Sequence, residues 1–280
     1  MNKLLIVDGH NLLFQMFFGM PARIVNKDGK AIQGTLGFVG ALLKIIKRVK
    51  PTHTVVLFDG ERHNPRTDLD ENYKANRVDY DAVPDDENPF TQLLDIYNAL
   101  DFLGIKHCET TVCETDDVIA AYALKYGKDN EIVISSFDSD FFQLITENVK
   151  ILRYRGDSTQ IYDTEFFFNK FGILPEFYAD YKSLTGDTAD NIKGADKIGP
   201  KTAAALVNQF GNLENIIKNA EKITKPSIRE SVLRNKERIK LNYKLIKLCD
   251  CAELPFVLDK IKYNYNGITT NEVLIGIGLK

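Results

Sequence analysis

The 280-residue sequence contains no tryptophan, three methionines and four cysteines. No apolar run approaches the roughly 20 residues that a membrane-spanning helix needs. The cysteines form no C-x-x-C pair and have no histidine partners at zinc-binding spacing, which excludes a zinc finger. The apolar run at 4–7 is too short for the core of a signal peptide. With 18 glycines and 9 prolines, collagen-like and low-complexity classes are also excluded. These absences indicate a globular protein, and we expect it in the cytoplasm.

Charge is distributed unevenly along the chain, although the formal net charge is only −3. Residues 1–190 hold 20 Lys and Arg against 30 Asp and Glu, a net charge of −10. Residues 191–248 hold 13 Lys and Arg against 5 Asp and Glu, a net charge of +8. Separate acidic and basic regions suggest two tasks for one chain, with solvated helix faces as the plain alternative.

Three short apolar runs each lead into an aspartate. The runs are 4–7, 54–58 and 132–137, and the aspartates are Asp8, Asp59 and Asp138. The runs are rich in branched residues and do not alternate with polar ones, which is typical of strands buried on both faces of a parallel sheet. Helical patterns at 34–49 and 89–104 lie between them, so we predict an α/β fold with a mostly parallel central sheet flanked by helices. Because ligands bind beyond the carboxyl ends of such strands, the aspartates should face one crevice.

Six more acids occur in three further clusters of the sequence. They are Glu114, Asp116 and Asp117 in CETDD, Asp140 in FDSD, and Asp187 and Asp190 in GDTADN. Any single one could cap a helix. Nine carboxylates cannot share a crevice, however, unless positive charge neutralises them. Magnesium does so where phosphates react, and two ions about 4 Å apart clamp the attacking and leaving oxygens of a phosphodiester. We therefore favour a two-metal phosphoryl-transfer site over unrelated helix caps.

Five sequence motifs occur in an order that resembles the bacterial 5′ nucleases. They are LLIVDGHNL, LFDGERHNPRTDLDENYKANR, CETDDVIAAYA, SSFDSDFFQLI and TGDTADNIKGADKIGPKTAAALVNQFGNLENI. The family comprises the 5′→3′ exonuclease domain of DNA polymerase I, phage 5′ exonucleases and flap endonucleases, and the resemblance extends to about residue 250. It implies a PIN-like nuclease core over 1–180 and a helical helix-hairpin-helix subdomain over 181–250. The tail, 251–280, is expected to pack on the core and has no assigned function.

The resemblance divides the nine acids into two metal-binding groups. The first group would be Asp8, Asp59, Glu114, Asp116 and Asp117, and the second would be Asp138, Asp140, Asp187 and Asp190. All nine positions are acidic in this sequence, which implies an intact site for two Mg²⁺ or Mn²⁺ ions. Some of the acids would act through water, because magnesium keeps part of its hydration shell.

The polar segment 60–90 resembles the family's helical arch, through which a single-stranded 5′ end passes; a floppy insertion is the alternative. Arg66 and Lys74 would contact the scissile phosphate and supply positive charge as its negative charge grows. Tyr73 would stack on a base, with an exposed helix tyrosine as the competing interpretation. Arg77 would contact the phosphate backbone.

The segment NIKGADKIGPKTAAALVNQFG resembles a helix-hairpin-helix. Gly194 and Gly199 would permit its tight turn, and Pro200 suits the first position of a helix. The family binds a potassium ion here through backbone carbonyls, which by alignment belong to Leu184, Thr185, Lys193, Ala195 and Ile198. Contacts to duplex DNA would come from Lys197, Gly199, Lys201 and Thr202. The basic helical stretch 225–248 would extend this surface, unless it is only a solvated amphipathic face.

The resemblance implies a divalent-metal-dependent 5′-3′ exonuclease and flap endonuclease. Its substrates would be flap, nicked or gapped DNA with a free 5′ end in replication and repair, including RNA primer strands. We expect a monomer that binds no membrane and acts alone or with a separate DNA polymerase, because the chain has no room for a polymerase domain. One alternative is a haloacid-dehalogenase-like phosphatase with Asp138 as nucleophile, which leaves Asp8 and Asp59 unexplained. The other is a structure-specific DNA-binding protein that no longer cuts, against which the nine acids argue.

Overall fold

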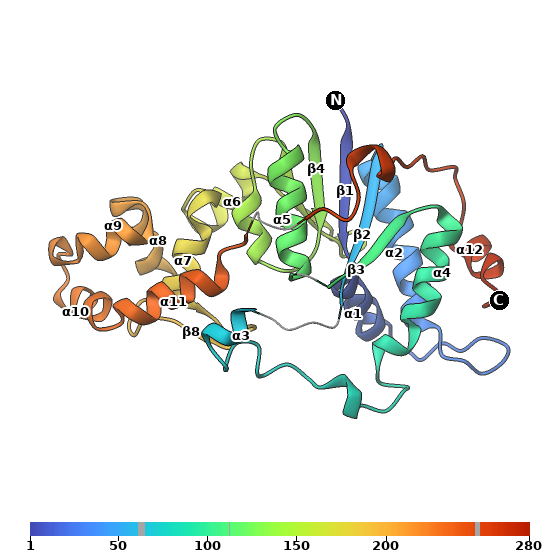
Figure 1. Cartoon of the computed structure of the whole chain (residues 1–280), viewed down its shortest axis with the longest axis horizontal. Coiled ribbons are helices and arrows are strands. Elements are labelled where there is room, and N and C mark those ends of the chain that lie inside the picture. The colour runs from blue at the N-terminus through green and yellow to red at the C-terminus, as the bar shows by residue number, and fades with distance from the viewer. Residues whose placement is uncertain (61–64, 112, 250–252) are drawn as a thin grey trace.

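The computed structural model describes residues 1–60, 65–111, 113–249 and 253–280. Four residues of the predicted arch, 61–64, and two of the predicted tail, 251–252, therefore lie outside the described residues. The described chain forms an α/β core around a six-stranded sheet, with a helical region at one end of the core (Figure 1). Among these residues, no helix combines the length and the apolar character that a membrane crossing requires.

The central sheet has the strand order β3-β2-β1-β4-β5-β6. Its strands are β1 (Lys3–Asp8), β2 (His53–Asp59), β3 (Lys106–Thr110), β4 (Glu131–Ser135), β5 (Val149–Arg153) and β6 (Gln160–Tyr162). The first five strands are parallel, and β6 pairs antiparallel with β5. The predicted mostly parallel sheet is thus confirmed. The strand order reverses between β1 and β4, and this is where a crevice opens beyond the carboxyl ends of the strands.

The predicted strands are those in the middle of the sheet. The runs at 4–7 and 54–58 are buried in β1 and β2, whereas β4 ends at Ser135, before the predicted end of its run. Strands β3, β5 and β6 were not predicted. The edge strand β3 has the polar sequence KHCET, so it lacks the apolar run that marks a strand covered on both faces.

Helices cover both faces of the sheet. One face carries α1 (Gly9–Gly19), α2 (Gln33–Val49) and α4 (Leu93–Leu103), and the other carries α5 (Thr115–Tyr126). The helix predicted at 34–49 is confirmed as α2. The pattern at 89–104 is divided into a 3₁₀ helix, Pro89–Gln92, and α4. Further 3₁₀ helices are Tyr80–Ala82, Asp140–Leu144, Pro175–Phe177, Ala220–Lys222 and Leu258–Ile261.

The helical region follows β6 and lies at the left of Figure 1. It contains α6 (Thr164–Phe171), α7 (Tyr178–Thr185), α8 (Pro200–Phe210), α9 (Leu213–Lys218), α10 (Pro226–Arg234), α11 (Lys236–Ile246) and the two-residue strands β7 (Gly186–Asp187) and β8 (Ile192–Lys193). The basic helical stretch predicted at 225–248 comprises α10 and α11. They are separated at Asn235, whose side-chain amide donates to the carbonyl oxygen of Ser231 over 2.8 Å.

A strap, residues 65–88, crosses from the helical region to α4 along the lower edge of the molecule in Figure 1. Among the described residues of 60–90, the only α-helix is α3 (Pro65–Leu69). The strap is fixed to the β7–β8 turn, because the backbone N of Lys74 donates to the carbonyl oxygen of Asp190 over 3.0 Å. The side-chain amide of Asn76 donates to the carbonyl oxygen of Thr188 over 3.2 Å.

The tail returns from the helical region to the far side of the core (Figure 1). The backbone N of Tyr263 donates to the carbonyl oxygen of Thr52 over 2.9 Å, beside the start of β2. The last helix, α12 (Thr270–Gly276), buries Val273 against residues of α2 and α4. The tail therefore covers one outer side of the helices that pack on the sheet.

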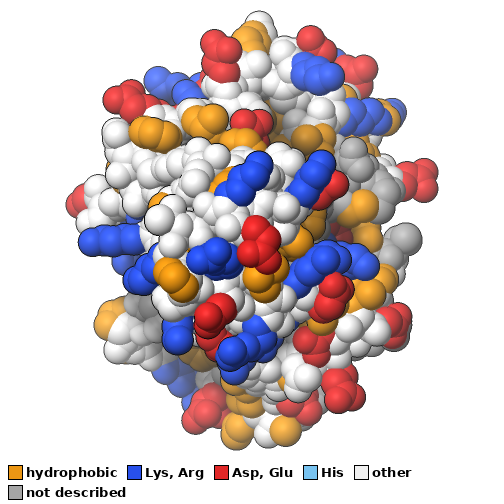
Figure 2. All heavy atoms as spheres, turned by 90° about the vertical axis from the view of Figure 1, so that its left-hand side faces the viewer, with side chains coloured by type: hydrophobic (Ala, Val, Ile, Leu, Met, Phe, Trp, Pro, Cys, Tyr) orange, Lys and Arg blue, Asp and Glu red, His pale blue; other side chains and the backbone are white. Residues whose placement is uncertain are grey.

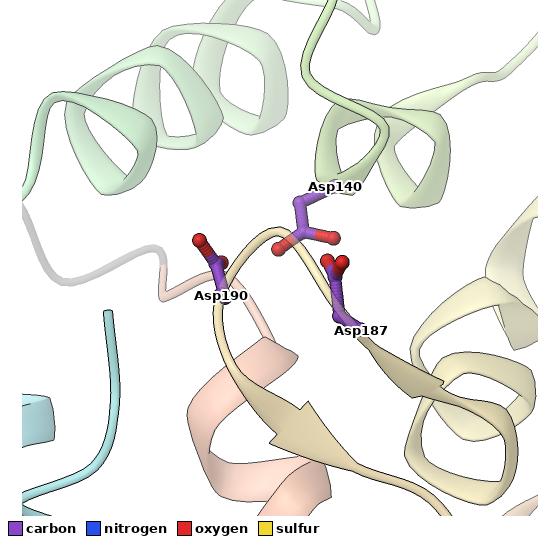
Figure 3. A group of neighbouring side chains, drawn as sticks. All are labelled: Asp140, Asp187 and Asp190. Atoms are coloured by element: carbon purple, nitrogen blue, oxygen red, sulfur yellow. The ribbon is translucent and has the colours of Figure 1, made fainter. Parts of the chain in front are cut away.

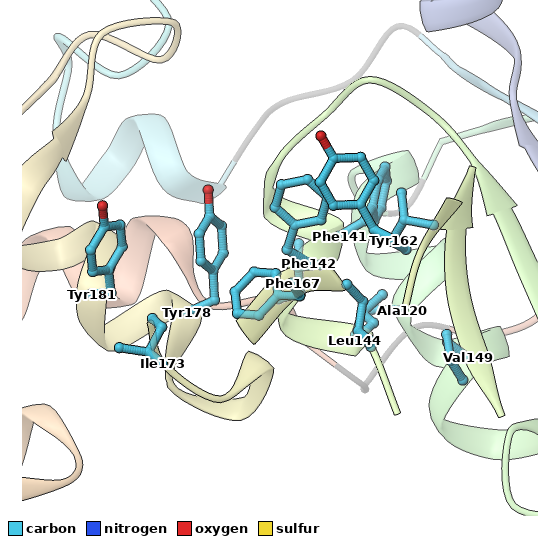
Figure 4. Close-up of a cluster of buried hydrophobic side chains, with 14 of the residues drawn as sticks. Ala120, Phe141, Phe142, Leu144, Val149, Tyr162, Phe167, Ile173, Tyr178 and Tyr181 are labelled. Carbon is cyan, nitrogen blue, oxygen red and sulfur yellow. The ribbon is translucent and has the colours of Figure 1, made fainter. Parts of the chain in front are cut away.

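An aromatic cluster joins the sheet to the helical region (Figure 4). The ring of Phe142 lies 4.7 Å from that of Tyr162, 5.6 Å from that of Phe167 and 5.5 Å from that of Tyr178, measured between centroids. These rings belong to the 3₁₀ helix 140–144, β6, α6 and α7. The cluster therefore fixes the segment that begins with Asp140 against α7.

We expect Phe142→Ala to lower the free energy of unfolding by about 3–5 kcal/mol, because it removes a fully buried ring and leaves a cavity. Urea unfolding monitored by circular dichroism measures this change. Phe168→Ala is the matched control, since the ring of Phe168 is 48% exposed and its loss should cost under about 1 kcal/mol. Equal losses in the two variants would contradict the packing role of the cluster.

Candidate active site

Asp8 stands at the carboxyl end of β1 and caps α1. Its Oδ1 accepts from the backbone N of Asn11 over 3.1 Å, and its Oδ2 accepts from the hydroxyl of Ser136 over 2.8 Å. Burial raises the pKa of Asp8 to about 7, although both hydrogen bonds act to lower it. Within the described part of the chain, no Lys or Arg forms an ion pair with this carboxylate. The side chain is therefore positioned accurately, but its charge is poorly compensated.

Asp59 stands at the equivalent end of the neighbouring strand, β2. Its Oδ1 accepts from the backbone N of Thr115 over 3.1 Å. Burial acts to raise the pKa of Asp59, but the hydrogen bonds from Thr115 and the nearby His10 and Lys74 hold it below its ordinary value. The Nδ1 of His10 in turn accepts from the backbone N of Asp59 over 3.3 Å. Asp59 thus remains ionised beside Asp8.

Three acids stand at the start of α5. Glu114 accepts from Lys74 over 2.9 Å and from Arg66, and these cations lower its pKa against the effect of burial. Asp117 forms a bidentate pair with Arg66, over 2.8 and 2.9 Å. Asp116 lies 3.9 Å from the amine of Lys74, and burial, followed by the repulsion of a neighbouring carboxylate, raises its pKa well above the ordinary value. The first predicted group therefore contains two acids that are paired with cations and others that are much less compensated.

The second predicted group meets beside the first. Asp140, Asp187 and Asp190 bring carboxylate oxygens within 4.8 Å of one another, and Figure 3 shows Asp140 and Asp187 pointing toward each other. Asp140 begins the 3₁₀ helix that follows β4, Asp187 ends β7, and Asp190 lies in the β7–β8 turn. Burial raises the pKa of Asp140 to about 7, and it also raises the pKa of Asp190.

Asp138 connects the two groups. Its Oδ1 accepts from the backbone N of Asp140 over 2.8 Å. Its negative charge contributes to the raised pKa of Asp8 and of Asp116 in the first group, and to that of Asp140 in the second. The fold therefore gathers the acids of separate sequence clusters into one field of negative charge.

Lys182 is a site residue that no sequence motif predicted. It lies on α7, is 4% exposed, and forms ion pairs with Asp140 and Asp187. Burial alone would lower the pKa of Lys182, but the adjacent carboxylates raise it, so the amine stays charged. A single lysine within a helix carries no spacing pattern, and only the fold shows that its amine lies between two of the acids.

The four predicted residues of the strap take different positions. Lys74 has a left-handed backbone with φ of 58°, and its amine pairs with Glu114. The guanidinium of Arg77 pairs with Asp190 over 3.2 Å. Arg66 is 9% exposed beneath the acids that it binds. Tyr73 is 5% exposed and lies in a turn, so the alternative of an exposed helix tyrosine is wrong. Base stacking by Tyr73 stays a prediction.

A cavity of about 1080 Å³ lies between the ends of the strands and the strap. Six acids line it: Asp79, Glu109 and four of the nine predicted acids, Asp8, Asp59, Asp116 and Asp138. Lys74 and Arg77 form part of its wall, whereas Arg66 is not among the described residues that line it. An aromatic wall completes the cavity, contributed by His10, Phe14, Tyr80 and Phe90. The cavity is large enough for a ligand bigger than a typical drug-sized molecule, whose pockets reach about 1,000 Å³.

The predicted hairpin is closely packed, but not at both of the predicted glycines. A Cβ on Gly194 would lie 2.3 Å from the carbonyl oxygen of Thr185, and one on Gly186, where φ is 79°, would lie 2.4 Å from the backbone N of Gly194. A Cβ on Gly199 would meet nothing within 4 Å. Glycine is therefore required at positions 186 and 194, because their backbones are in contact. The expectation that the tight turn needs glycine at position 199 is wrong.

The backbone carbonyls predicted to bind potassium lie on two adjoining segments. These are the end of α7, with Leu184 and Thr185, and the segment from β8 onward, with Lys193, Ala195 and Ile198. The carbonyl oxygen of Leu184 accepts from the backbone N of Ala195 over 2.9 Å, which holds the segments together. The carbonyl oxygen of Lys193 accepts from the side chain of Asn242 over 2.9 Å. Each carbonyl has a second lone pair that a cation can use.

The residues predicted to contact duplex DNA surround the start of α8. Lys197, Gly199 and Lys201 are exposed, and Thr202 is half-buried. Lys197 adopts a left-handed backbone with φ of 64°. Figure 2 shows the outer end of the helical region, where Lys and Arg side chains are spread over the surface and interspersed with Asp and Glu.

The site electrostatics predict a pH-dependent stability. Asp8 titrates near 7 in the folded protein and near 3.8 when exposed, so between these values the folded state holds a proton that the unfolded state has lost, and stability falls as the pH rises from about 4 to 7. In EDTA, we expect the stability of Asp8→Asn relative to the natural chain to be higher at pH 8 than at pH 5, by about 1–3 kcal/mol. Urea unfolding at both pH values measures the difference. The exposed Asp129→Asn is the control, and an Asp8→Asn effect of the same size at both pH values would refute the burial argument.

Comparison with known protein families matches nearly the whole chain. The 5′-3′ exonuclease N-terminal resolvase-like domain matches residues 3–172, and the 5′-3′ exonuclease C-terminal SAM fold matches residues 173–267. A 5′-3′ exonuclease of Aquifex aeolicus is 35% identical over 249 residues, which cover 89% of this chain and 82% of that protein. A 5′-3′ exonuclease of Buchnera aphidicola is 35% identical over 257 residues, covering 88% and 86%.

Longer relatives and solved structures complete the comparison. The thermostable DNA polymerase I of Thermus thermophilus is 32% identical over 258 residues, and this chain spans 30% of its length. The structure of T5 5′-exonuclease with bound zinc ions has a TM-score of 0.72 at 23% identity, covering 98% of this chain and 99% of that one. The catalytic core of Rad2 in complex with DNA has a TM-score of 0.59 at 18% identity, covering 99% and 92%. The structures share the fold, and the domain matches with the 35% identical relatives establish that this chain belongs to the 5′-3′ exonuclease family.

Proposed function

We propose that this chain is a divalent-metal-dependent 5′ nuclease with both 5′-3′ exonuclease and flap endonuclease activity on DNA. The observation that carries this proposal is the gathering of buried carboxylates at one edge of the sheet, with too few basic side chains to neutralise them. The relatives named 5′-3′ exonucleases support it. So does a structural neighbour, T5 flap endonuclease, which was crystallised as a pseudo-enzyme-product complex with DNA and metal ions.

The donor set fits two hard divalent cations, Mg²⁺ or Mn²⁺, because every donor is a carboxylate oxygen. One ion would be held by Asp138, Asp140, Asp187 and Asp190, and the other by Asp8, Asp59 and Asp116. Glu114 and Asp117 pair with cations of the strap. We therefore propose that they contact the ion held by Asp8, Asp59 and Asp116 only through water or through neighbouring residues. When bound, the ions would activate water and stabilise the charge on the attacking and leaving oxygens.

The basic residues of the strap would hold the phosphate. Lys74 lines the cavity beside Asp116, where its ammonium can donate to a phosphate oxygen as negative charge develops. Arg77 lines the same wall and would contact an adjoining phosphate. Arg66 would have to leave Glu114 and Asp117 to reach the scissile phosphate. In the geometry described here it is a positioning residue for those two acids.

The helix-hairpin-helix would hold the duplex part of the substrate. We propose that a potassium ion binds the carbonyls at 184–185 and 193–198, and that phosphates contact Lys197, Gly199, Lys201 and Thr202. The start of α8 supports this, because exposed backbone N–H groups at a helix N-terminus suit phosphate. The substrate would be a flap, nick or gap with a free 5′ end, RNA primer strands included. The protein would act as a monomer alongside a DNA polymerase.

The two alternatives explain less of the geometry. A haloacid-dehalogenase-like phosphatase would use Asp138 as nucleophile, and it has no role for the two acids at the ends of β1 and β2 or for the strap cations. A DNA-binding protein without activity would gain nothing from carboxylates whose burial raises their pKa to about 7. Trapping phosphate on Asp138 would favour the first alternative. Tight flap binding without any product in Mg²⁺ or Mn²⁺ would favour the second.

A 5′-labelled flap duplex tests the proposal directly. With Mg²⁺ we expect a short labelled product cut near the junction, no product in EDTA, and at least a 100-fold lower rate for Asp140→Asn, because a metal ligand is lost. Denaturing gel electrophoresis measures the product, and the exposed Asp129→Asn should cut at the normal rate. Undiminished cleavage by Asp140→Asn would rule out the proposed metal role of that acid.

Lys74 and Arg66 should differ in a kinetic test. Lys74→Ala should lower kcat by about 100-fold or more with little change in KM, because it removes a charge that acts on the transition state. Arg66→Ala should in addition lower the free energy of unfolding, since it leaves Glu114 and Asp117 buried without their partner. Single-turnover rates and urea unfolding separate the two effects. If Lys74→Ala retained normal kcat, its phosphate contact would be disproved.

A further inference from the structure

Every second residue of the strap from 72 to 76 forms a hydrogen bond to the β7–β8 turn. The side-chain amide of Asn191 donates to the carbonyl oxygen of Asn72 over 2.9 Å, the backbone N of Lys74 donates to that of Asp190 over 3.0 Å, and the side-chain amide of Asn76 donates to that of Thr188 over 3.2 Å. Strap residues 72, 74 and 76 thus meet turn residues 191, 190 and 188, so the two segments run in opposite directions. We call this set of three bonds the latch.

Lys74 is the middle residue of the latch, and its backbone is strained. Its φ of 58° is left-handed, a conformation that residues with long side chains rarely adopt. Such strain persists only where the surrounding contacts fix it. Here the backbone N of Lys74 is bonded to the turn, and the bonds at Asn72 and Asn76 fix the chain on either side of it. Asn191 also has a φ of 58°, which asparagine tolerates.

The latch decides where the charge of Lys74 lies. The amine of Lys74 donates to Glu114 over 2.9 Å and lies 3.9 Å from Asp116, so it reaches the acids at the start of α5. Its backbone is joined to Asp190, which belongs to the other group of acids. If the strap slid along the turn, the ammonium would move away from α5. A misplacement of about 1 Å at a reacting centre can lower a rate by about 100-fold.

We propose that Asn191 and Asn76 are positioning residues, which hold the strap in register with the β7–β8 turn so that Lys74 can donate to the scissile phosphate. This inference rests on the proposed nuclease function and adds two residues to it. Asn76 also lines the cavity, whereas Asn191 is not among the described residues that do so. Asn191 therefore gives the cleaner test, because its effect on the reaction would pass through its bond to the strap.

Three substitutions separate the latch from a general effect on the fold. Asn191→Gly removes the amide, and glycine adopts the left-handed backbone readily. Asn76→Ala removes the bond on the other side of Lys74. Both side chains are exposed, so the variants should fold. Asn208→Ala is the matched control, because the exposed amide of Asn208 also donates to a distant carbonyl oxygen, that of Gly172, over 2.7 Å.

The kinetic test measures single-turnover cleavage of the 5′-labelled flap in Mg²⁺, at saturating enzyme, in two backgrounds. In the natural chain, Asn191→Gly and Asn76→Ala should each lower the rate about tenfold, and Asn208→Ala should leave it unchanged. In the Lys74→Ala background, the two latch substitutions should lower the rate less than about twofold, because a residue that acts through Lys74 then has nothing left to position.

Equal losses in the two backgrounds would show that the latch supports the fold or the turn rather than Lys74, and this would overturn the proposal. So would unchanged rates for both latch variants of the natural chain. A natural chain that cuts no flap in Mg²⁺ or Mn²⁺ would instead count against the nuclease function on which the proposal rests.

Limited digestion with trypsin tests the latch without any cleavage of DNA. Trypsin cuts after lysine and arginine, so Lys74 and Arg77 provide sites within and directly after the latch. Cutting requires the strap to open locally. We expect Asn191→Gly and Asn76→Ala to raise the rate of cutting at these sites about tenfold, and Asn208→Ala to leave it unchanged, with the sites identified by mass spectrometry. Unchanged cutting in both latch variants would refute the latch, whether or not the protein cuts a flap.

Discussion

The burial of several carboxylates side by side is the constraint on which this structure depends. Burial raises the pKa of Asp8 and Asp140 to about 7. It also raises the pKa of Asp116 well above its ordinary value, and the nearby charge of Lys74 offsets only part of this rise. Such groups persist only where surrounding packing forces them together and a positive partner can stabilise them. The parallel sheet supplies that packing, since its central strands are buried on both faces and end side by side.

Three separate parts of the chain contribute the partial compensation. Lys182 reaches the second group from α7, which the aromatic cluster around Phe142 fixes against the core. Arg66 bridges the first group to the end of α11, because its guanidinium also donates to the carbonyl oxygen of Lys247 over 3.3 Å. Lys74 ties the strap to both groups, through its amine and through its backbone, in a strained left-handed conformation. The acids therefore hold core, strap and helical region together, and any cation that enters competes with these contacts.

Sequence patterns were sufficient to predict the strands whose burial requires an uninterrupted run of apolar residues. The apolar runs before Asp8 and Asp59 predicted strands because central parallel strands admit few polar residues. The family motifs then placed the remaining acids, which no periodicity could relate. The role of Lys182 and the contact between Gly186 and Gly194 could not be predicted, because each depends on a partner that only the fold brings close. Strand β3 was not predicted because this polar edge strand lacks an apolar run.

The strap gives the cavity a charged part and an aromatic part. In its first half, Lys74 and Arg77 form ion pairs with the acids. In its second half, the rings of Tyr80 and Phe90 pack against Phe14 of α1. Neither half has a hydrophobic core of its own, so each keeps its place through the surface that it covers.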